Sequence, residues 1–108
     1  MNGGDHMSPA SGSQAVDRAL ALLQITGRGA GRGVALSELI AASGLGKPTV
    51  RRLMLALIRR GLVEQDSATR LYFLGEESYV LGTLATPRHG LLEIASIRLG
   101  SVQARSLC

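Results

Sequence analysis

Five basic side chains lie close together in the middle of the sequence, with no acidic residue between the first and the last of them. They are Lys47, Arg51, Arg52, Arg59 and Arg60. A solvated helix usually mixes charges of both signs, because pairs at i and i+4 then stabilise it. Because these basic side chains have no acidic partners within the helix, the pattern favours binding to an external polyanion. The chemistry that such a set would perform is the neutralisation of nucleic-acid phosphates.

The net charge of the chain is confined to the same region. Residues 47–70 hold six basic and two acidic residues, whereas residues 1–46 and 71–108 each hold three of either sign. The formal charge of +4 therefore arises entirely within 47–70. A basic patch confined to one segment is typical of nucleic-acid binding.

A helix is predicted over 47–60, and its dipole separates the basic residues into two groups. Arg59 and Arg60 lie at the carboxyl end, where cations also stabilise a helix. For these two, capping is the favoured explanation, with phosphate contact as a second role. The other three lie toward the amino end, where the dipole disfavours cations. Nucleic-acid contact explains these three better than helix stabilisation does.

The residues around this helix predict a helix-turn-helix. Apolar residues recur along 47–60 at the i, i+3, i+4, i+7 spacing of a core-facing helix, namely Val50, Leu53, Met54 and Leu57. Before it, Ser37 is predicted to cap a helix over 38–43. A glycine turn then separates the two helices. In that turn Gly44 would take the left-handed conformation that ends a helix, and Leu45 would enter the core.

A further helix and a short strand are predicted before this unit. Ser13 would cap a helix that runs to about Thr26. Its buried stripe would consist of Val16, Ala19, Leu20 and Leu23. Residues 34–36 are apolar and form a candidate short strand.

A hairpin is predicted after the helix-turn-helix. Strands over 62–65 and 71–74 would be joined by a five-residue turn at 66–70. The expected fold class is therefore mostly α with a small β-hairpin wing. This is a winged helix-turn-helix, with a three-helix core and a short antiparallel sheet, followed by a linker helix.

The C-terminal region is expected to be that linker. A helical turn over 76–81 would end at Gly82, Pro87 would break the chain, and a final helix would occupy 91–107. The final helix carries a weak seam for a partner helix, formed by Leu92, Ala95, Leu99, Val102 and Ser106.

Other kinds of chemistry have little support. The glycine-rich segment 27–33 does not match G-x-G-x-x-G, which argues against a dinucleotide-binding loop. His6 and His89 stand alone and Cys108 is the one cysteine, so we expect no enzyme, no cofactor and no metal centre. Neither an apolar run of about 20 residues nor an apolar signal core occurs. We therefore expect a cytoplasmic protein with no membrane contact.

A recognisable pattern runs through two stretches, SQAVDRALALLQ (13–24) and VALSELIAASGLGKPTVRRLMLALIRRGLVEQDSATRLYFLG (34–75). Over residues 13–82 it resembles the N-terminal DNA-binding domain of the IclR-type bacterial transcriptional regulators. The resemblance implies a winged helix-turn-helix that binds palindromic operators of double-stranded DNA as a homodimer. It also implies a helical linker to a larger domain that senses a small-molecule effector.

Four positions depart from the usual pattern of that family. Pro48 stands where a small hydroxyl residue is usual, which removes one potential phosphate contact. Arg51 replaces a more frequent His or Tyr and would alter base preference. Arg70 adds a charge at the wing tip, where glycine is common. Phe73 replaces a polar strand residue, and would be exposed or would cover the final helix.

The resemblance assigns roles to the two DNA-facing elements. Helix 47–60 would lie in the major groove, and the wing at 66–70 would contact the DNA backbone or the minor groove. Arg51 and Arg52 are candidates for bidentate guanine contacts, because the arginine fork matches O6 and N7. Arg70 would reach a flanking phosphate or the minor groove.

The remaining candidates would hold the DNA backbone. Lys47 and the amides of the first helical turn would bind phosphate, and Thr49 would contact a thymine methyl group or a phosphate. Ser37 would offer its amide to a phosphate, with simple capping as the alternative. The full set of candidate DNA-binding residues is Ser37, Lys47, Pro48, Thr49, Arg51, Arg52 and Arg70.

The expected function is sequence-specific DNA binding by a transcriptional regulator. The expected organisation is a disordered leader at 1–12, the winged helix-turn-helix at 13–82, and a linker and dimerisation helix at 83–108, with the effector domain absent. The alternative is a winged-helix module used for protein–protein contact. The concentration of charge on helix 47–60 disfavours it, because protein interfaces are depleted in charge at their centres.

Overall fold

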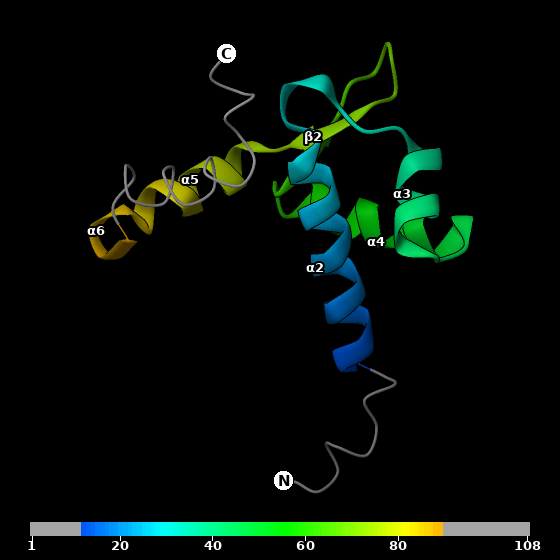
Figure 1. Ribbon diagram of the computed structural model, residues 1–108, viewed down its shortest axis with the longest axis horizontal. Helices are drawn as coiled ribbons and strands as arrows, with labels where there is room; N and C mark the ends of the chain where they lie inside the picture. The colour runs from blue at the N-terminus through cyan, green and yellow to red at the C-terminus, as the bar shows by residue number, and fades with distance from the viewer. Residues whose placement is uncertain (1–11, 90–108) are drawn as a thin grey trace, which may run out of the picture. The chain divides into compact units, whose positions relative to one another are not determined.

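The computed structural model describes residues 12–89, and the chain divides into one compact unit that ends at Ser78 and another that begins at Tyr79. The elements in chain order are α2 (Gly12–Arg28), η1 (Ala30–Arg32), α3 (Leu36–Ser43), α4 (Lys47–Arg59), β1 (Val63–Gln65), β2 (Tyr72–Leu74), α5 (Glu76–Leu84) and α6 (Thr86–His89) (Figure 1). The expectations for residues 1–11, for the helix at 91–107 and for its seam lie outside the described residues.

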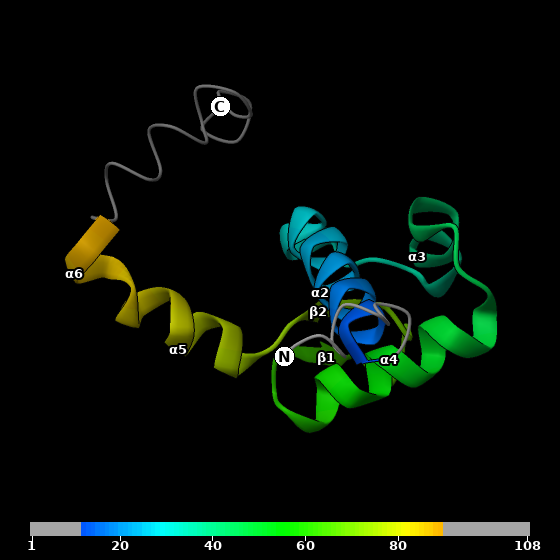
Figure 2. The same ribbon diagram turned by 90° about the horizontal axis from the view of Figure 1, so that it is seen from below.

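The core of the first unit forms where α2, α3 and α4 pack on one another and on the hairpin. In the ribbon views α2 crosses α4, and α3 lies beside both (Figures 1 and 2). The predicted stripe of α4 is buried along its whole length, from Val50 to Leu57. The buried apolar residues are Leu22, Val34, Leu39, Val50, Leu53, Met54, Leu57, Val63 and Tyr72.

The predicted buried stripe of α2 was right for Ala19 and Leu23, which pack against the core, and wrong for its other two residues. Val16 and Leu20 are 57% and 48% exposed, whereas Leu22 and Thr26 are fully buried. The buried face keeps the i, i+3, i+4, i+7 spacing but begins at Ala19. Thr26 can lie in the core because its hydroxyl donates a hydrogen bond to the Leu22 carbonyl oxygen at 2.8 Å. The helix also contains Ser13, which is therefore not its cap.

The glycine turn between α3 and α4 has the expected geometry. Gly44 has a φ of 75°, and its N–H donates to the Ile40 carbonyl oxygen at 2.9 Å, which ends α3. Leu45 packs against the core. Gly46 then caps α4 through its carbonyl oxygen, which accepts the Val50 N–H at 3.0 Å.

The start of α3 differs from the prediction. The N-cap residue is Ala35 and the helix begins at Leu36, so Ser37 lies in the first turn and does not cap it. The Glu38 carboxylate accepts the Ala35 N–H at 2.8 Å, which is the one bond of a capping box that an alanine N-cap allows. Of the predicted strand over 34–36, Val34 and Ala35 are extended but only Val34 pairs, in an isolated bridge with Tyr72.

The hairpin forms as predicted, with each strand one residue shorter at its amino end. Its antiparallel register pairs Val63 with Leu74 and Gln65 with Tyr72. Tyr72 also exchanges two backbone hydrogen bonds with Val34, at 2.8 and 2.9 Å, so the hairpin is tied to the chain segment before α3. This anchoring fixes the wing to the helix-turn-helix unit.

The first alternative for Phe73, an exposed side chain, is wrong, and the second, a contact with the final helix, involves residues outside the described range. The Phe73 side chain is half-buried and lies against Gly33, where an added Cβ would come within 2.7 Å of the ring. Gly33 also has a φ of 84°, so this position requires glycine for two reasons.

The helices after the wing extend further than predicted. The helix α5 passes through Gly82 and ends at Leu84, and Pro87 lies inside α6 rather than at a break. Pro87 is the second residue of α6, in the first turn, where a helix does not need the missing N–H. The start of α5 is anchored, because the Ser78 hydroxyl donates to the Leu62 carbonyl oxygen at 2.8 Å.

Candidate nucleic-acid interface

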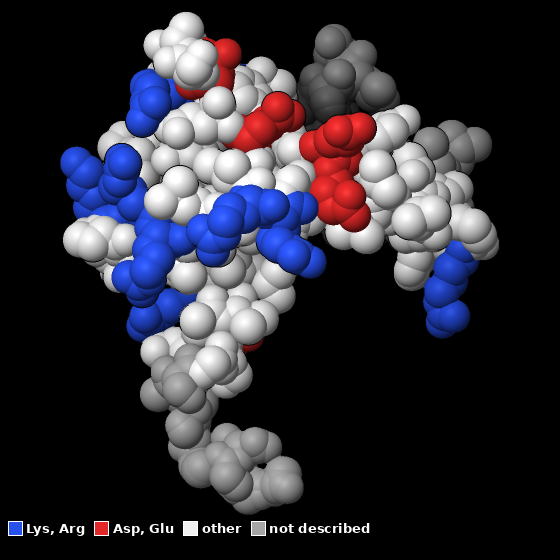
Figure 3. Space-filling model, turned by 180° about the vertical axis from the view of Figure 1, so that it is seen from behind, with Lys and Arg blue, Asp and Glu red and all other residues white. Residues whose placement is uncertain are grey.

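The face of α4 that does not enter the core is basic. Lys47, Arg51 and Arg52 are exposed, as are Arg59 and the C-cap residue Arg60. In the space-filling view from behind, basic side chains form a band over the part of the surface where α4 lies, and no described acidic side chain interrupts it (Figure 3). The basic residues that lie close together in the sequence therefore also share one surface, which we call the basic face of α4.

The charges of this basic face are not neutralised by ion pairs within the described chain. In the part of the chain that the structure describes, none of its side chains forms an ion pair. Arg32 differs, because its guanidinium lies 3.3 Å from the Glu38 carboxylate. The Ala35 N–H lowers the pKa of the Glu38 carboxyl below its ordinary range, and Arg32 adds to that effect. Charge on the basic face is thus left for an external partner.

The amino end of α4 offers fewer amide donors than a typical helix does. Gly46 has no side chain to cap the first turn. Pro48 is the second residue of the helix and has no N–H, so Lys47 and Thr49 supply the first amides. Thr49 itself is half-buried, whereas Lys47 and Pro48 are exposed. An anion at this end would therefore meet two amides and the Lys47 ammonium group.

Ser37 lies on a different element from the basic face. It is exposed in the first turn of α3, next to Glu38. The neighbouring carboxylate makes this helix end less favourable for a phosphate than the amino end of α4.

The tip of the wing is ordered by one aspartate. The Asp66 carboxylate accepts hydrogen bonds from the Ala68 N–H at 3.1 Å, the Thr69 N–H at 2.7 Å and the Thr69 hydroxyl at 2.9 Å. The Asp66 carbonyl oxygen accepts the Arg70 N–H at 2.8 Å, and Gln65 donates its side-chain amide to the Arg70 carbonyl oxygen at 2.9 Å. Together these bonds hold the backbone on both sides of Arg70.

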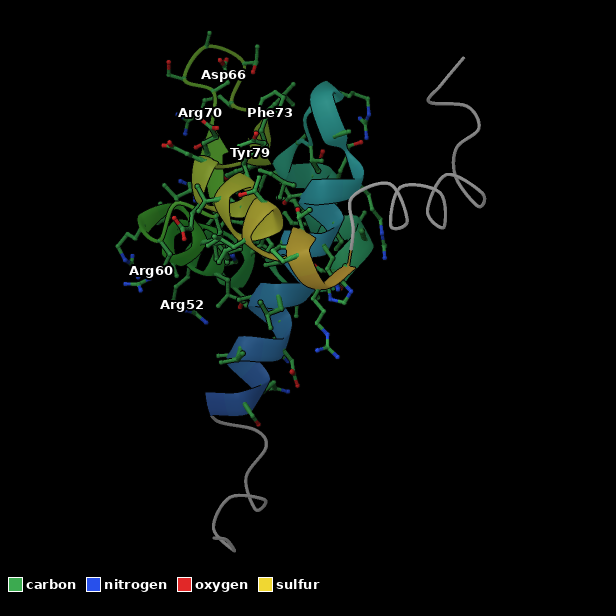
Figure 4. All side chains as sticks on the ribbon, turned by 90° about the vertical axis from the view of Figure 1, so that its left-hand side faces the viewer. Arg52, Arg60, Asp66, Arg70, Phe73 and Tyr79 are labelled. Atoms are coloured by element: carbon green, nitrogen blue, oxygen red, sulfur yellow. The ribbon has the colours of Figure 1, made fainter. Side chains whose placement is uncertain are left out.

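Arg70 is exposed at this tip and has a φ of 67°. That is the left-handed region, which an arginine adopts at a cost and glycine adopts freely. Asp66 and Arg70 lie at the wing, and Arg52 and Arg60 project from α4 (Figure 4). The structure thus places two separate basic elements, α4 and the wing tip, on the surface.

Two residues of this region were missed by the sequence interpretation. Asp66 organises the wing, and an Asp followed three residues later by Thr is a recognisable turn signal. Leu55 is 53% exposed on α4, although it is apolar. Its position outside the buried stripe could have been read from the helical spacing.

Metal or membrane chemistry is not indicated by the described residues. Within 12–89, no group of His, Cys, Asp and Glu residues is placed to hold a metal ion. In the same range, no helix is both long and apolar enough to cross a membrane.

Comparison with known proteins agrees with this geometry. Residues 15–67 match the family model of the IclR helix-turn-helix domain. The glycerol operon regulatory protein of Streptomyces coelicolor is 37% identical over 78 residues, which cover 72% of this chain and 30% of the relative. The HTH-type transcriptional regulator BhcR of Paracoccus denitrificans is 31% identical over 93 residues, which cover 86% of this chain and 33% of the relative. The chain thus spans about a third of the length of these curated relatives.

Solved structures give the same result. A putative IclR transcriptional regulator from Silicibacter sp. TM1040 is similar at a TM-score of 0.61 and 38% identity, covering 79% of this chain and 33% of that chain. An IclR family transcriptional regulator from Brucella abortus is similar at a TM-score of 0.60 and 30% identity, covering 76% of this chain and 31% of that chain.

The three-helix core, the glycine turn and the anchored hairpin define a winged helix-turn-helix domain. Through residues 15–67 this domain is of the IclR helix-turn-helix type, and the relatives and solved structures that it resembles are transcriptional regulators.

Proposed function

We propose that this protein binds double-stranded DNA in a sequence-specific manner, as the DNA-binding part of an IclR-type transcriptional regulator. The observation that carries the proposal is the basic face of α4, which is exposed, free of acids and positioned by a fully buried apolar stripe. A helix with this division of charge fits the major groove, where its exposed face meets base edges.

The site residues divide into base-reading and backbone-binding groups in this proposal. Arg51 and Arg52 extend from adjacent positions on α4, and each can donate two hydrogen bonds to guanine. Lys47 and the amide of Thr49 bind a phosphate at the amino end of the helix. Pro48 lies among them without an amide donor, so it packs against the DNA rather than holding it.

The wing and α3 supply further backbone contacts. Arg70 is presented outward at the wing tip and reaches a flanking phosphate or the minor groove. Ser37 contributes a phosphate contact from α3, weaker than the others because of the adjacent Glu38.

We further propose that the protein binds a palindromic operator as a homodimer. Operator dimers place two recognition helices about 34 Å apart, which requires a contact between the two copies. Within the first unit, Val16 and Leu20 are exposed on one face of α2 and are suited to such a contact. Residues 13–82 act as the DNA-binding domain and 83–108 as linker and dimerisation segment. The matched stretches cover 30% and 33% of the two relatives, and a small-molecule effector belongs to the proposal only if a further domain follows.

The proposal includes no catalytic role and places the protein in the cytoplasm, where DNA is accessible. A protein–protein module is disfavoured, because an uninterrupted set of arginines and a lysine is costly to desolvate in a protein interface.

Selection from random double-stranded DNA tests the proposal. The wild type should enrich a defined site, and the double variant Arg51→Ala/Arg52→Ala should lose that enrichment while keeping its helical circular dichroism. Arg88→Ala removes a charge from α6 and serves as the control, which should select the same site. Failure of the wild type to enrich any duplex sequence would refute sequence-specific binding.

A further inference from the structure

One apolar side chain lies on the basic face of α4. Leu55 is 53% exposed, whereas the other large apolar residues of that helix point into the core. Single exposed leucines are common on protein surfaces and need no explanation by themselves. Leu55 differs because of its neighbours, which are the side chains proposed to read DNA.

The helical spacing puts Leu55 in the same row as these side chains. Pro48, Arg51, Arg52 and Leu55 follow the i, i+3, i+4, i+7 pattern of one helix face, and all four are exposed. Helices that lie in the major groove contact bases from residues with this same spacing. The rise of about 1.5 Å per residue separates Leu55 from Arg52 by about 4.5 Å along the axis, which is between one and two base-pair steps of about 3.4 Å.

The chemistry of the side chain limits what it can recognise. Leucine neither donates nor accepts a hydrogen bond, so it gains nothing from the polar edges of guanine, adenine or cytosine. Thymine is the one base whose major-groove edge carries an apolar group, the C5-methyl. Contact between that methyl group and Leu55 removes two apolar groups from water, which is favourable. A polar base edge placed against Leu55 would lose the water molecules that it hydrogen-bonds, which is unfavourable.

We propose that Leu55 is a specificity-determining residue that contacts the C5-methyl group of a thymine, within one or two base pairs of the bases read by Arg51 and Arg52. The inference rests on the proposed function, because it requires α4 to lie in the major groove. The same apolar group occurs on 5-methylcytosine, so a methylated cytosine at this position would be recognised in the same way.

Replacement of thymine by uracil tests this directly, because it removes only the methyl group. In a site selected from random DNA, each thymine is replaced in turn by deoxyuridine, and affinity is measured by fluorescence anisotropy. For the wild type we expect a loss of about fourfold at one position, the effect of one buried methyl-sized group. Leu55→Ala should bind the thymine and uracil duplexes equally at that position. Leu55→Met, which keeps an apolar side chain, should still distinguish them.

A second arm restores the methyl group on another base. Replacing the same T·A pair by C·G should weaken wild-type binding, and 5-methylcytosine at that position should recover part of it. Leu55→Ala should show no recovery. Leu81→Ala truncates a leucine of α5 that is similarly exposed, at 51%, and should behave as the wild type in both arms.

The outcomes separate this inference from the proposed function. Specific duplex binding by the wild type with no sensitivity to any thymine-to-uracil change would overturn the role of Leu55 and leave DNA binding intact. The same holds if Leu55→Ala keeps the full thymine preference. A wild type without any duplex preference would overturn both.

Discussion

The Asp66 carboxylate holds Thr69 at the tip of the wing, where one oxygen accepts both the Thr69 N–H at 2.7 Å and the Thr69 hydroxyl at 2.9 Å. The Thr69 hydroxyl oxygen in turn accepts the Leu71 N–H at 3.2 Å. These hydrogen bonds fix the backbone before and after Arg70. The position of Arg70, a candidate DNA-binding residue, therefore depends on Asp66, which as an acid cannot itself bind phosphate.

The protonation of Asp66 should control the order of the wing. Hydrogen bonds from Thr69 lower the pKa of Asp66 below the ordinary value of 3.8. Because the folded-state pKa is depressed, the stabilisation is present above the ordinary value and is lost as the pH falls through the lowered one. In an NMR titration, the Thr69 amide should keep its native shift at pH 4 to 5 and change only at lower pH. A change centred above 3.8 would contradict this assignment.

Replacement of Arg70 by glycine should separate stability from DNA binding. The left-handed conformation at φ 67° is strained for arginine, so Arg70→Gly should stabilise the fold by about 1 kcal/mol in urea unfolding. The same variant should lose affinity for the preferred duplex and for random duplexes by the same factor, because a phosphate contact is lost. Arg70→Ala should lose the same affinity without gaining stability. Equal stability of the three proteins would show that the backbone is not strained.

Arg52 should read a base rather than a phosphate. Arg52→Ala should cost about 1–3 kcal/mol on the preferred site and flatten discrimination at one base pair. Arg59→Ala, at the carboxyl end of the same helix, should have a smaller effect and leave the base preference unchanged. Competition binding with preferred and random duplexes measures both. An equal loss on the two DNAs for Arg52→Ala would make it a backbone contact.

The proposed dimer should be weak in solution and firm on DNA. We expect partial association in sedimentation at tens of micromolar protein, and full dimers on a palindromic site. Leu20→Glu should abolish cooperative binding to the full site, because a charge replaces an exposed apolar residue of α2. Its affinity for an isolated half-site should remain that of the wild type. Unchanged cooperativity would place the dimer contact elsewhere in the chain.

The helix-turn-helix could be predicted from the sequence because its signals are local. The apolar spacing of α4 identifies its buried face, and Gly44 adopts the left-handed turn that its position predicted. The carboxyl end of α4 is equally regular, since Gly61 has a φ of 77° and the Leu62 N–H donates to the Leu57 carbonyl oxygen at 3.0 Å.

The errors arose where a distant part of the chain decides the outcome. In α2, two overlapping apolar stripes compete, and packing against α4 and β2 selects the one that ends at Thr26. At the start of α3, Val34 is drawn into a bridge with Tyr72, so the helix begins before Ser37. The spacing of apolar residues in the sequence predicts neither the packing of α2 nor the bridge between Val34 and Tyr72.

The charged residues of the candidate site could be predicted from the sequence, whereas two of its other residues were missed. Lys47, Arg51 and Arg52 are exposed as expected, because the buried stripe of α4 leaves them no other direction. Leu55 was left out of the core-facing stripe and also out of the site, because the candidates on α4 were chosen mainly by charge. Asp66 was overlooked because its role is to position Arg70 and not to contact a ligand.

The salt dependence of duplex binding is the most direct test of the central claim that the basic face of α4 and the wing bind DNA. If they neutralise about four phosphates per protomer, a plot of log K against log salt should have a slope of about −3 to −4 per bound subunit. Arg70→Ala should reduce that slope by about one. A slope near zero with double-stranded DNA would contradict the account.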